Sequence, residues 1–135
     1  MNLCNFAEAC RLEMHAVLDL LERQFHDVRC LSMRFGVHSG GVTAGVLRGQ
    51  KSRFELFGDT INTASRMESL GLPDKIQISQ ETATLLVQGG YAECVIPRDT
   101  MIHAKGKGEL QTFWFVKDDD LSVGSEVEIL NSLQP

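Results

Sequence analysis

The sequence predicts an α+β fold with helices packed on one face of a largely antiparallel sheet. Three observations carry this prediction. Two segments repeat apolar residues at the three- and four-residue steps of a helix. Several short segments have the alternating or continuous apolar pattern of strands, and turn residues between them are typical of hairpins. Because strands and helices alternate along the chain, the two kinds of element should share one core.

The first predicted helix covers residues 6–26. Its apolar side chains recur at helical spacing and are Phe6, Cys10, Met14, Val17, Leu18, Leu21 and Phe25. Residues 31–37 alternate in polarity, which predicts a strand with one buried face. Ser39-Gly40-Gly41 has turn composition, and a second strand follows at 42–47. These segments predict a hairpin over residues 31–47.

Residues 48–53 form a polar, basic loop before a short strand at 54–57. A helix is predicted over residues 59–70, with Asp59 or Thr60 as its N-cap. Gly71 and Pro73 follow it, and both residues are typical of a helix end. Residues 76–78 then predict a buried strand.

Ser79 is a predicted N-cap for a helix that ends near Gln88, before two glycines. Three more strands are predicted at 91–96, 101–104 and 112–116. From Asp118 the chain is acidic and loses periodicity. We therefore predict one domain over residues 1–117 and an acidic tail or linker over 118–135.

Composition limits the function classes. The 135 residues suit one domain, and the net charge of −5 argues against a nucleic-acid partner. No apolar run approaches the roughly 18 residues of a membrane span, and no signal peptide is visible. The cysteines Cys4, Cys10, Cys30 and Cys94 lack zinc-site spacing, so we expect reduced thiols and a cytoplasmic location.

The most informative segment is Phe54–Gly71, FELFGDTINTASRMESLG. It places Asn62 and Arg66 four residues apart in the predicted helix, so the two side chains should share one face. An amide beside a fixed cation suits a phosphoryl group that gains negative charge. A solvated helix face is the alternative interpretation of the same pair.

This segment resembles the signature of class III nucleotidyl cyclases, the adenylate and guanylate cyclase catalytic domains. Three further blocks match the same domain in the same order: MRFGVHSGGVTAGVL at 33–47, KIQISQETATLL at 75–86 and KGKGELQTFWF at 105–115. The resemblance covers about residues 5–117. It is strongest to receptor-type guanylate cyclases and to the cyclases of unicellular algae.

The resemblance implies a ferredoxin-like core with additions and a site at a dimer interface. There, two carboxylates hold two Mg²⁺ or Mn²⁺ ions, and the partner subunit supplies an Asn and an Arg. Asn62 and Arg66 occupy those motif positions. Lys105 matches the lysine that contacts the terminal phosphates, whereas the role of Lys107 is left open.

Glu55 stands where the family recognises the purine, with Leu56 and Phe57 beside it as further substrate-binding candidates. The family usually has Asp or Cys at this position, so Glu55 is a departure. A carboxylate only accepts hydrogen bonds. Guanine offers it two adjacent donors and adenine one, which favours GTP slightly without excluding ATP.

The family's two metal-binding aspartates have no counterpart in this sequence, because neither of their motif contexts occurs here. Asp19, Asp27, Asp74 and Asp99 lie in unrelated contexts. We therefore expect about the first third of the domain to be absent, with apolar surface and open sheet edges as a result. Alone, the chain should have no cyclase activity.

Two other functions remain open. The chain could be a non-catalytic, cyclase-like module that binds and regulates a partner cyclase subunit. It could also be an unrelated ferredoxin-like module, for example for RNA. Its acidic charge and the lack of paired surface aromatics on a strand count against RNA.

Overall fold

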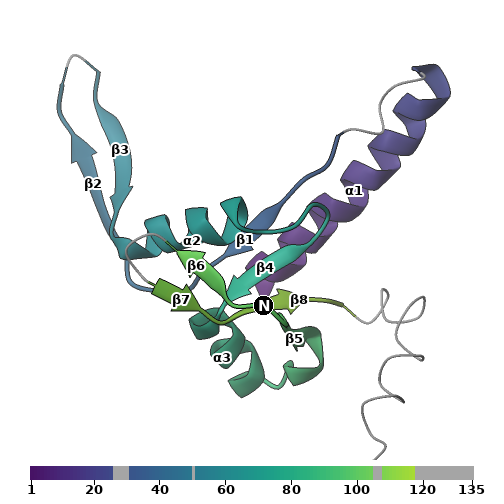
Figure 1. Ribbon diagram of the computed structural model, residues 1–135. Helices are drawn as coiled ribbons and strands as arrows, with labels where there is room; N and C mark the ends of the chain where they lie inside the picture. The colour runs from purple at the N-terminus through teal and green to yellow at the C-terminus, as the bar shows by residue number, and fades with distance from the viewer. Residues whose placement is uncertain (26–30, 50, 105–107, 118–135) are drawn as a thin grey trace, which may run out of the picture.

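The computed structural model describes residues 1–25, 31–49, 51–104 and 108–117 (Figure 1). Its elements, in chain order, are α1 (Asn2–Gln24), β1 (Phe35–Val37), β2 (Thr43–Leu47), β3 (Arg53–Phe57), α2 (Asp59–Ser69), β4 (Ile76–Ser79), α3 (Gln80–Gln88), the 3₁₀ helix η1 (Ala92–Cys94), β5 (Val95–Pro97), β6 (Ile102–Ala104), β7 (Gly108–Leu110) and β8 (Thr112–Phe115).

The main sheet has the strand order β1-β4-β8-β5. Strand β1 runs parallel to β4, whereas β8 is antiparallel to both β4 and β5. Two antiparallel pairs, β2-β3 and β6-β7, complete the strands. The predicted α+β class with mainly antiparallel pairing is confirmed.

The core lies on one face of this sheet, between the strands, α1 and α3. Ile76 and Ile78 of β4 point into it and are at most 2% exposed. The other buried members of the cluster are Cys4, Ala7, Val37, Ala83, Leu86, Cys94 and Phe115. Because β4 is central and all four of its residues are buried, it anchors both faces of the sheet.

Helix α2 packs on the opposite face, where Gln77 of β4 points. The Gln77 amide lies 3.9 Å from the Met67 sulfur, and both side chains are fully buried. Gly36 of β1 allows this approach, because a Cβ there would lie 2.0 Å from the Glu68 backbone nitrogen. The helices therefore divide between two faces, in contrast to the predicted arrangement on one face.

The predicted hairpin over residues 31–47 is wrong. Strand β1 pairs with β4, and β2 pairs with β3, so the basic loop between Leu47 and Arg53 forms the hairpin turn. Alternating polarity shows that a strand has one buried face, but it does not identify the neighbouring strand. Here the buried Val37 belongs to the core that β4 completes.

The three long helices lie close to their predicted positions, but several ends differ. Ser79 caps α3 as predicted, since its hydroxyl accepts from the Thr82 N–H at 3.4 Å. Helix α2 has Gly58 as its N-cap, in place of Asp59 or Thr60. The strand predicted at 91–96 starts only at Val95, because η1 comes first.

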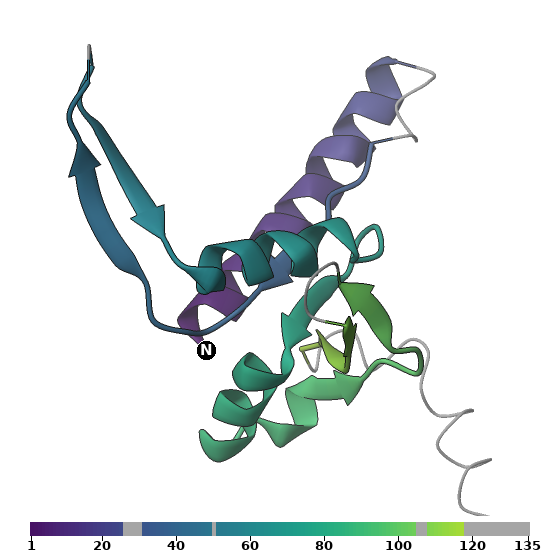
Figure 2. The same ribbon diagram turned by 60° about the vertical axis from the view of Figure 1, so that its left-hand side comes forward.

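Two arms project from the body of the molecule. Figures 1 and 2 show that the β2–β3 hairpin and the far end of α1 extend away from the sheet and diverge from each other. Several large apolar side chains on the arms are exposed: Val17 and Leu20 on α1, and Val46, Phe54 and Leu56 on the hairpin. The exposed apolar surface predicted from the sequence is thus present on both arms.

Candidate active site

Helix α2 is oriented by two residues one turn apart. Thr63 is 3% exposed and Met67 is fully buried, and both face the sheet. The Thr63 hydroxyl donates to the Asp59 carbonyl at 2.9 Å, which satisfies it within the helix. These two positions fix the rotation of α2 about its axis.

Asn62 and Arg66 each immediately precede one of these buried residues. At 3.6 residues per turn they lie about 100° away from the buried direction, on one flank of the helix. Asn62 is exposed and Arg66 is half-buried. Neither side chain has a hydrogen bond or ion pair with another described residue, so the pair is available to a ligand.

Glu55 and its neighbours lie on the hairpin arm. Glu55 pairs with Gly45 across the β2–β3 ladder. Alternation directs the side chains of Glu55 and Phe57 to one face and that of Leu56 to the other. The structure therefore does not bring these three side chains together. Leu56 can contact the same ligand as Glu55 only through its backbone groups.

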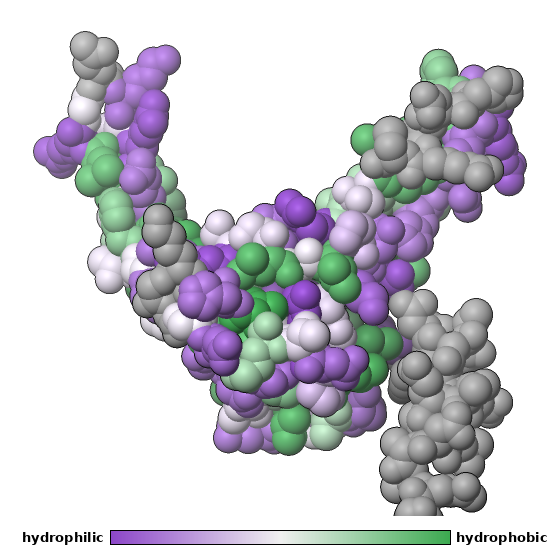
Figure 3. Space-filling model, in the orientation of Figure 1, coloured by the Kyte–Doolittle hydropathy of each residue, from purple (hydrophilic) through white to green (hydrophobic). Residues whose placement is uncertain are grey.

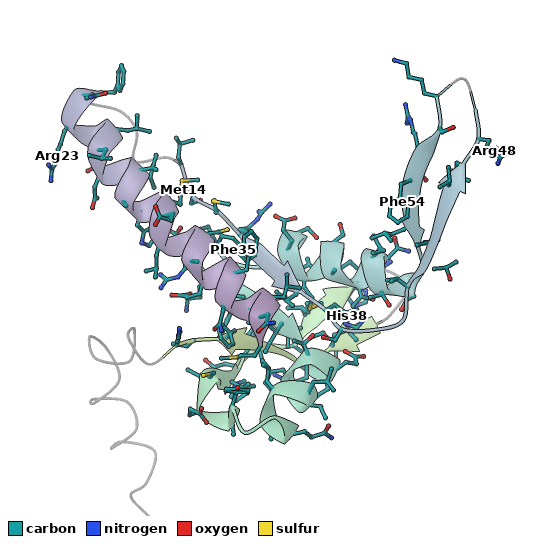
Figure 4. All side chains as sticks on the ribbon, turned by 180° about the vertical axis from the view of Figure 1, so that it is seen from behind. Met14, Arg23, Phe35, His38, Arg48 and Phe54 are labelled. Carbon is teal, nitrogen blue, oxygen red and sulfur yellow. The ribbon has the colours of Figure 1, made fainter. Side chains whose placement is uncertain are left out.

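The face of the arm that carries Glu55 is rich in positive charge. A hollow of about 640 Å³ runs along the hairpin toward its tip and includes Arg48, Lys51 and Arg53 beside Glu55. Figure 4 shows Arg48 near the tip and Phe54 lower on the arm. Cations surrounding one carboxylate make this face attractive to phosphate groups.

The foot of the arm is held against α2. Gly58, with φ of 136°, forms the turn between β3 and α2 and adopts a backbone conformation that favours glycine. The Thr60 hydroxyl donates to the Gly41 carbonyl at 2.6 Å and so ties the segment between β1 and β2 to the start of α2. This contact fixes where Glu55 and Asn62 lie relative to each other.

His38 secures the other side of the same connection (Figure 4). Its Nδ1 lies 2.7 Å from the Ser79 hydroxyl and 3.5 Å from a Glu81 carboxylate oxygen, and its side chain is 7% exposed. A lone histidine in the sequence is more often structural than catalytic, and its partner Ser79 could not be predicted because it lies 41 residues away. Both polar groups contact the same ring nitrogen, an arrangement that suits a structural histidine.

Lys105 and Lys107 lie outside the described residues. Among the residues described, no group of three or more His, Cys, Asp or Glu side chains could hold a metal ion. The donors in this part of the chain therefore do not match the two divalent ions that the resemblance implies.

The mixed sheet with its helices, and the amide beside a guanidinium on α2, agree with the α+β fold and the motif positions of the nucleotidyl cyclases. The family model for the adenylate and guanylate cyclase catalytic domain matches residues 3–117. The chain belongs to this family.

Similar proteins agree with this assignment. The chain is 49% identical over 94 residues to guanylate cyclase 2G of Rattus norvegicus, covering 69% of this chain and 8% of the relative. It is 41% identical over 115 residues to the receptor-type guanylate cyclase gcy-23 of Caenorhabditis elegans, covering 85% and 10%. The chain thus spans about a tenth of the length of these relatives.

Solved structures give the same result for the fold. The guanylate cyclase domain of RhGC from Catenaria anguillulae, solved in complex with GTP, matches with a TM-score of 0.53 and 39% identity. That match covers 62% of this chain and 43% of the solved chain. The adenylyl cyclase CyaB from P. aeruginosa matches with a TM-score of 0.57 at 24% identity, over 78% and 55% of the two chains, and supports the fold.

Proposed function

We propose that this chain is part of a guanylate cyclase catalytic domain, which converts GTP to cGMP and pyrophosphate in intracellular signalling. Its contribution is the half of the site that stabilises the transition state. The supporting observation is the pairing of Asn62 and Arg66 on one flank of α2, without other partners among the described residues, in a chain whose family match covers residues 3–117.

In this reaction the ribose 3′-oxygen loses its proton and bonds to the α-phosphorus, while the bond to the leaving pyrophosphate breaks. The protein's work is mainly positioning and charge stabilisation. Arg66 is always charged and suits the phosphoryl oxygens as they gain negative charge. Asn62, one turn away, can orient the ribose. The family's divalent ions, Mg²⁺ or Mn²⁺, would lower the charge of the phosphates when bound.

Glu55 is the proposed reader of the purine. Its carboxylate would accept from the guanine N1–H and 2-amino groups together, a bidentate arrangement that adenine cannot offer. The hollow beside it, with Arg48, Lys51 and Arg53, supplies positive charge for an anionic ligand. ATP is the alternative substrate, in which case the domain would be an adenylate cyclase. Variants at Glu55 would test this choice.

The proposed partner is a second cyclase subunit, because the hairpin arm exposes an apolar face that nothing in the described residues covers. Phe54 is 70% and Val46 is 61% exposed, and the two pair across the ladder. Figure 3 shows apolar surface on the lower part of this arm, below a largely hydrophilic tip. No helix among the described residues is long and apolar enough to cross a membrane. We propose that the chain lies in the cytoplasm, either in a cytoplasmic protein or on the cytoplasmic side of a membrane receptor.

Complementation tests this proposal. The Catenaria anguillulae domain, with alanine at the positions that align with Asn62 and Arg66, would retain its metal site but lose its own transition-state pair. Mixing it with this chain, GTP and Mn²⁺ should restore cGMP production. The chain alone should produce none. Restoration should fall about 10²–10³-fold with Arg66→Ala and stay unchanged with Ser65→Ala, an exposed neighbour on the same helix.

The same experiment distinguishes a catalytic half of a cyclase from a non-catalytic regulatory module. A non-catalytic regulatory module is favoured by the lack of a metal-ligand group among the described residues. Such a module would bind the altered domain without restoring turnover, and Arg66→Ala would change nothing.

Swapping Glu55 for Cys or Asp in the restored mixture should shift the ratio of GTP to ATP turnover. An unchanged ratio would remove the purine role of Glu55.

A further inference from the structure

Arg98 follows strand β5 and links it to helix α2. One nitrogen of its guanidinium, Nη1, donates to the Leu70 carbonyl at 2.9 Å and to the Gln77 side-chain oxygen at 2.6 Å. Leu70 is the C-cap of α2, and Gln77 is a fully buried residue of β4. A single cation therefore joins the end of the helix to the central strand. A positive charge at this end of a helix also complements the helix dipole.

Arg98 is itself held on several sides. Its backbone N–H donates to the Thr112 carbonyl at 2.9 Å, and its carbonyl accepts from the Gln111 side-chain amide at 2.8 Å. Its guanidinium lies 5.1 Å from the centroid of the Trp114 ring, within the range of a cation–π contact. Trp114 in turn pairs with Gln77 across β8 and β4. Helix α2 thus ends against a group that has little freedom to move.

The same contacts reach the turn of α2 that carries Arg66. The Leu70 N–H donates to the Arg66 carbonyl at 3.0 Å. Met67 follows Arg66 and is fully buried, with its sulfur 3.9 Å from the Gln77 amide nitrogen. Gln77 therefore contacts Arg98 through its oxygen and Met67 through its nitrogen. Through these contacts Arg98 helps to set where Arg66 lies along and around the helix axis.

Asn62 is positioned by other contacts. It lies in the first half of α2, where Thr63 is buried against the sheet and the Thr60 hydroxyl donates to the Gly41 carbonyl at 2.6 Å. Loss of the Arg98 side chain should therefore move Arg66 more than Asn62. An effect on one member of the pair distinguishes positioning from a general loss of the fold.

We propose that Arg98 is a positioning residue for Arg66 in the cyclase reaction. It acts through the last turn of α2 and keeps the Arg66 guanidinium directed at the phosphoryl oxygens that gain charge. Geometry set in advance matters for rate, because a misplacement of about 1 Å can cost on the order of 100-fold. The inference rests on the proposed function for the role of Arg66 in the reaction.

Kinetics in the complementation mixture test the proposal. Arg98→Met keeps a long side chain without the cation, and it should lower kcat for GTP about tenfold while changing KM less than about twofold. Arg98→Lys should recover most of kcat, because one ammonium nitrogen can donate to both acceptors that Nη1 contacts. Leu86→Ala controls for lost stability, since Leu86 is 3% exposed in the core on the other face of the sheet. It should keep kcat at a temperature at which circular dichroism shows every variant folded.

A double-mutant cycle and an exchange measurement separate positioning from stability. Because Arg98 acts through Arg66, adding Arg98→Met to Arg66→Ala should lower kcat by less than about twofold further. A merely structural role would lower kcat equally in both backgrounds. Amide hydrogen exchange of the chain alone needs no turnover. Arg98→Met should speed exchange at Leu70, whose N–H bonds to Arg66, at least about tenfold more than at Thr63.

Several results would overturn the inference: an unchanged kcat in Arg98→Met, an equal fall in both Arg66 backgrounds, or a fall as large in Leu86→Ala. Equal changes of exchange at Leu70 and Thr63 would overturn it as well. Failure of the unaltered chain to restore cGMP production would instead contradict the proposed function. In that case the exchange measurement alone decides whether Arg98 positions this turn of α2.

Discussion

Replacing Gly36 by alanine should displace α2 from the sheet. The new Cβ would lie 2.0 Å from the Glu68 nitrogen and 2.6 Å from both the Glu68 Cα and the Met67 carbonyl carbon. All three are backbone atoms, so no side-chain rotation can relieve the overlap. Ordinary carbon contacts are about 3.5–4 Å, so the helix must move by roughly 1.5 Å or the strand must bend.

The cost follows from what α2 packs against. Met67 is fully buried beside Gln77, and Arg34 forms an exposed 3.0 Å ion pair with Glu68 that contributes little. Overpacking of a filled interior typically costs 1–3 kcal/mol, and this overlap is with backbone, so we expect about 2–3 kcal/mol. For a chain of this size that lowers Tm by about 4 °C per kcal/mol, or roughly 8–12 °C.

Thermal unfolding followed by circular dichroism measures this effect. Gly41→Ala is the matched control, because no atom lies within 4 Å of the Cβ position and the backbone is not in the left-handed region. The control should leave Tm unchanged or raise it slightly, through the lower entropy of the unfolded chain. If the two variants melted within about 1 °C of each other, the close packing of β1 against α2 would be refuted.

Three further predictions concern residues away from that contact. His38→Ala should cost about 1–2 kcal/mol in urea unfolding, because Ser79 loses its 2.7 Å partner; no loss would show the contact is unimportant. Arg98→Met should cost about 1–3 kcal/mol by leaving the buried Gln77 oxygen, now 2.6 Å from Arg98, unpaired. Adding Gln77→Leu should recover part of that cost, and purely additive losses would contradict the coupling. Burial is the main reason that the pKa of Cys4 lies above its usual 9.0; Cys94 adds to this and the N-terminal ammonium opposes it. The folded thiol keeps its proton to higher pH. Its contribution to the free energy of unfolding is therefore complete below pH 9.0 and is lost as pH rises through the folded pKa. At pH 8, peptide mapping should show Cys10 alkylated before Cys4, and equal rates in the folded protein would refute the burial effect.

The sequence predicted best where pattern and local chemistry coincide. The signature helix over residues 59–70 was predicted nearly to its ends, because a capping residue precedes it and Gly71 and Pro73 stop it. The Ser79 cap was predicted for the same kind of reason, since its hydroxyl acts three residues away. Local signals of this type do not depend on the rest of the fold.

Long-range pairing could not be predicted in the same way. The hairpin was placed at 31–47 because Ser39-Gly40-Gly41 has turn composition, yet those residues carry the chain from β1 to the arm. The division of helices between two faces depends on Gly36, whose missing side chain has meaning only once Glu68 is known to lie above it. The partnership of His38 with Ser79 likewise joins residues 41 positions apart.

These long-range contacts determine the geometry on which the proposed chemistry depends. Gly36 sets how closely α2 approaches the sheet, and Thr60 ties the start of α2 to Gly41 at the foot of the arm. The purine-reading candidate on the arm and the amide–guanidinium pair on the helix are thus positioned by one set of contacts. Thr60→Val should therefore disturb the purine-reading candidate and the amide–guanidinium pair together, because it removes the 2.6 Å hydrogen bond to Gly41 while keeping the side-chain volume. In the complementation mixture, KM for GTP should rise and kcat should fall, with a loss of about 1 kcal/mol in stability. A variant that lost stability alone would show that arm and helix are positioned independently.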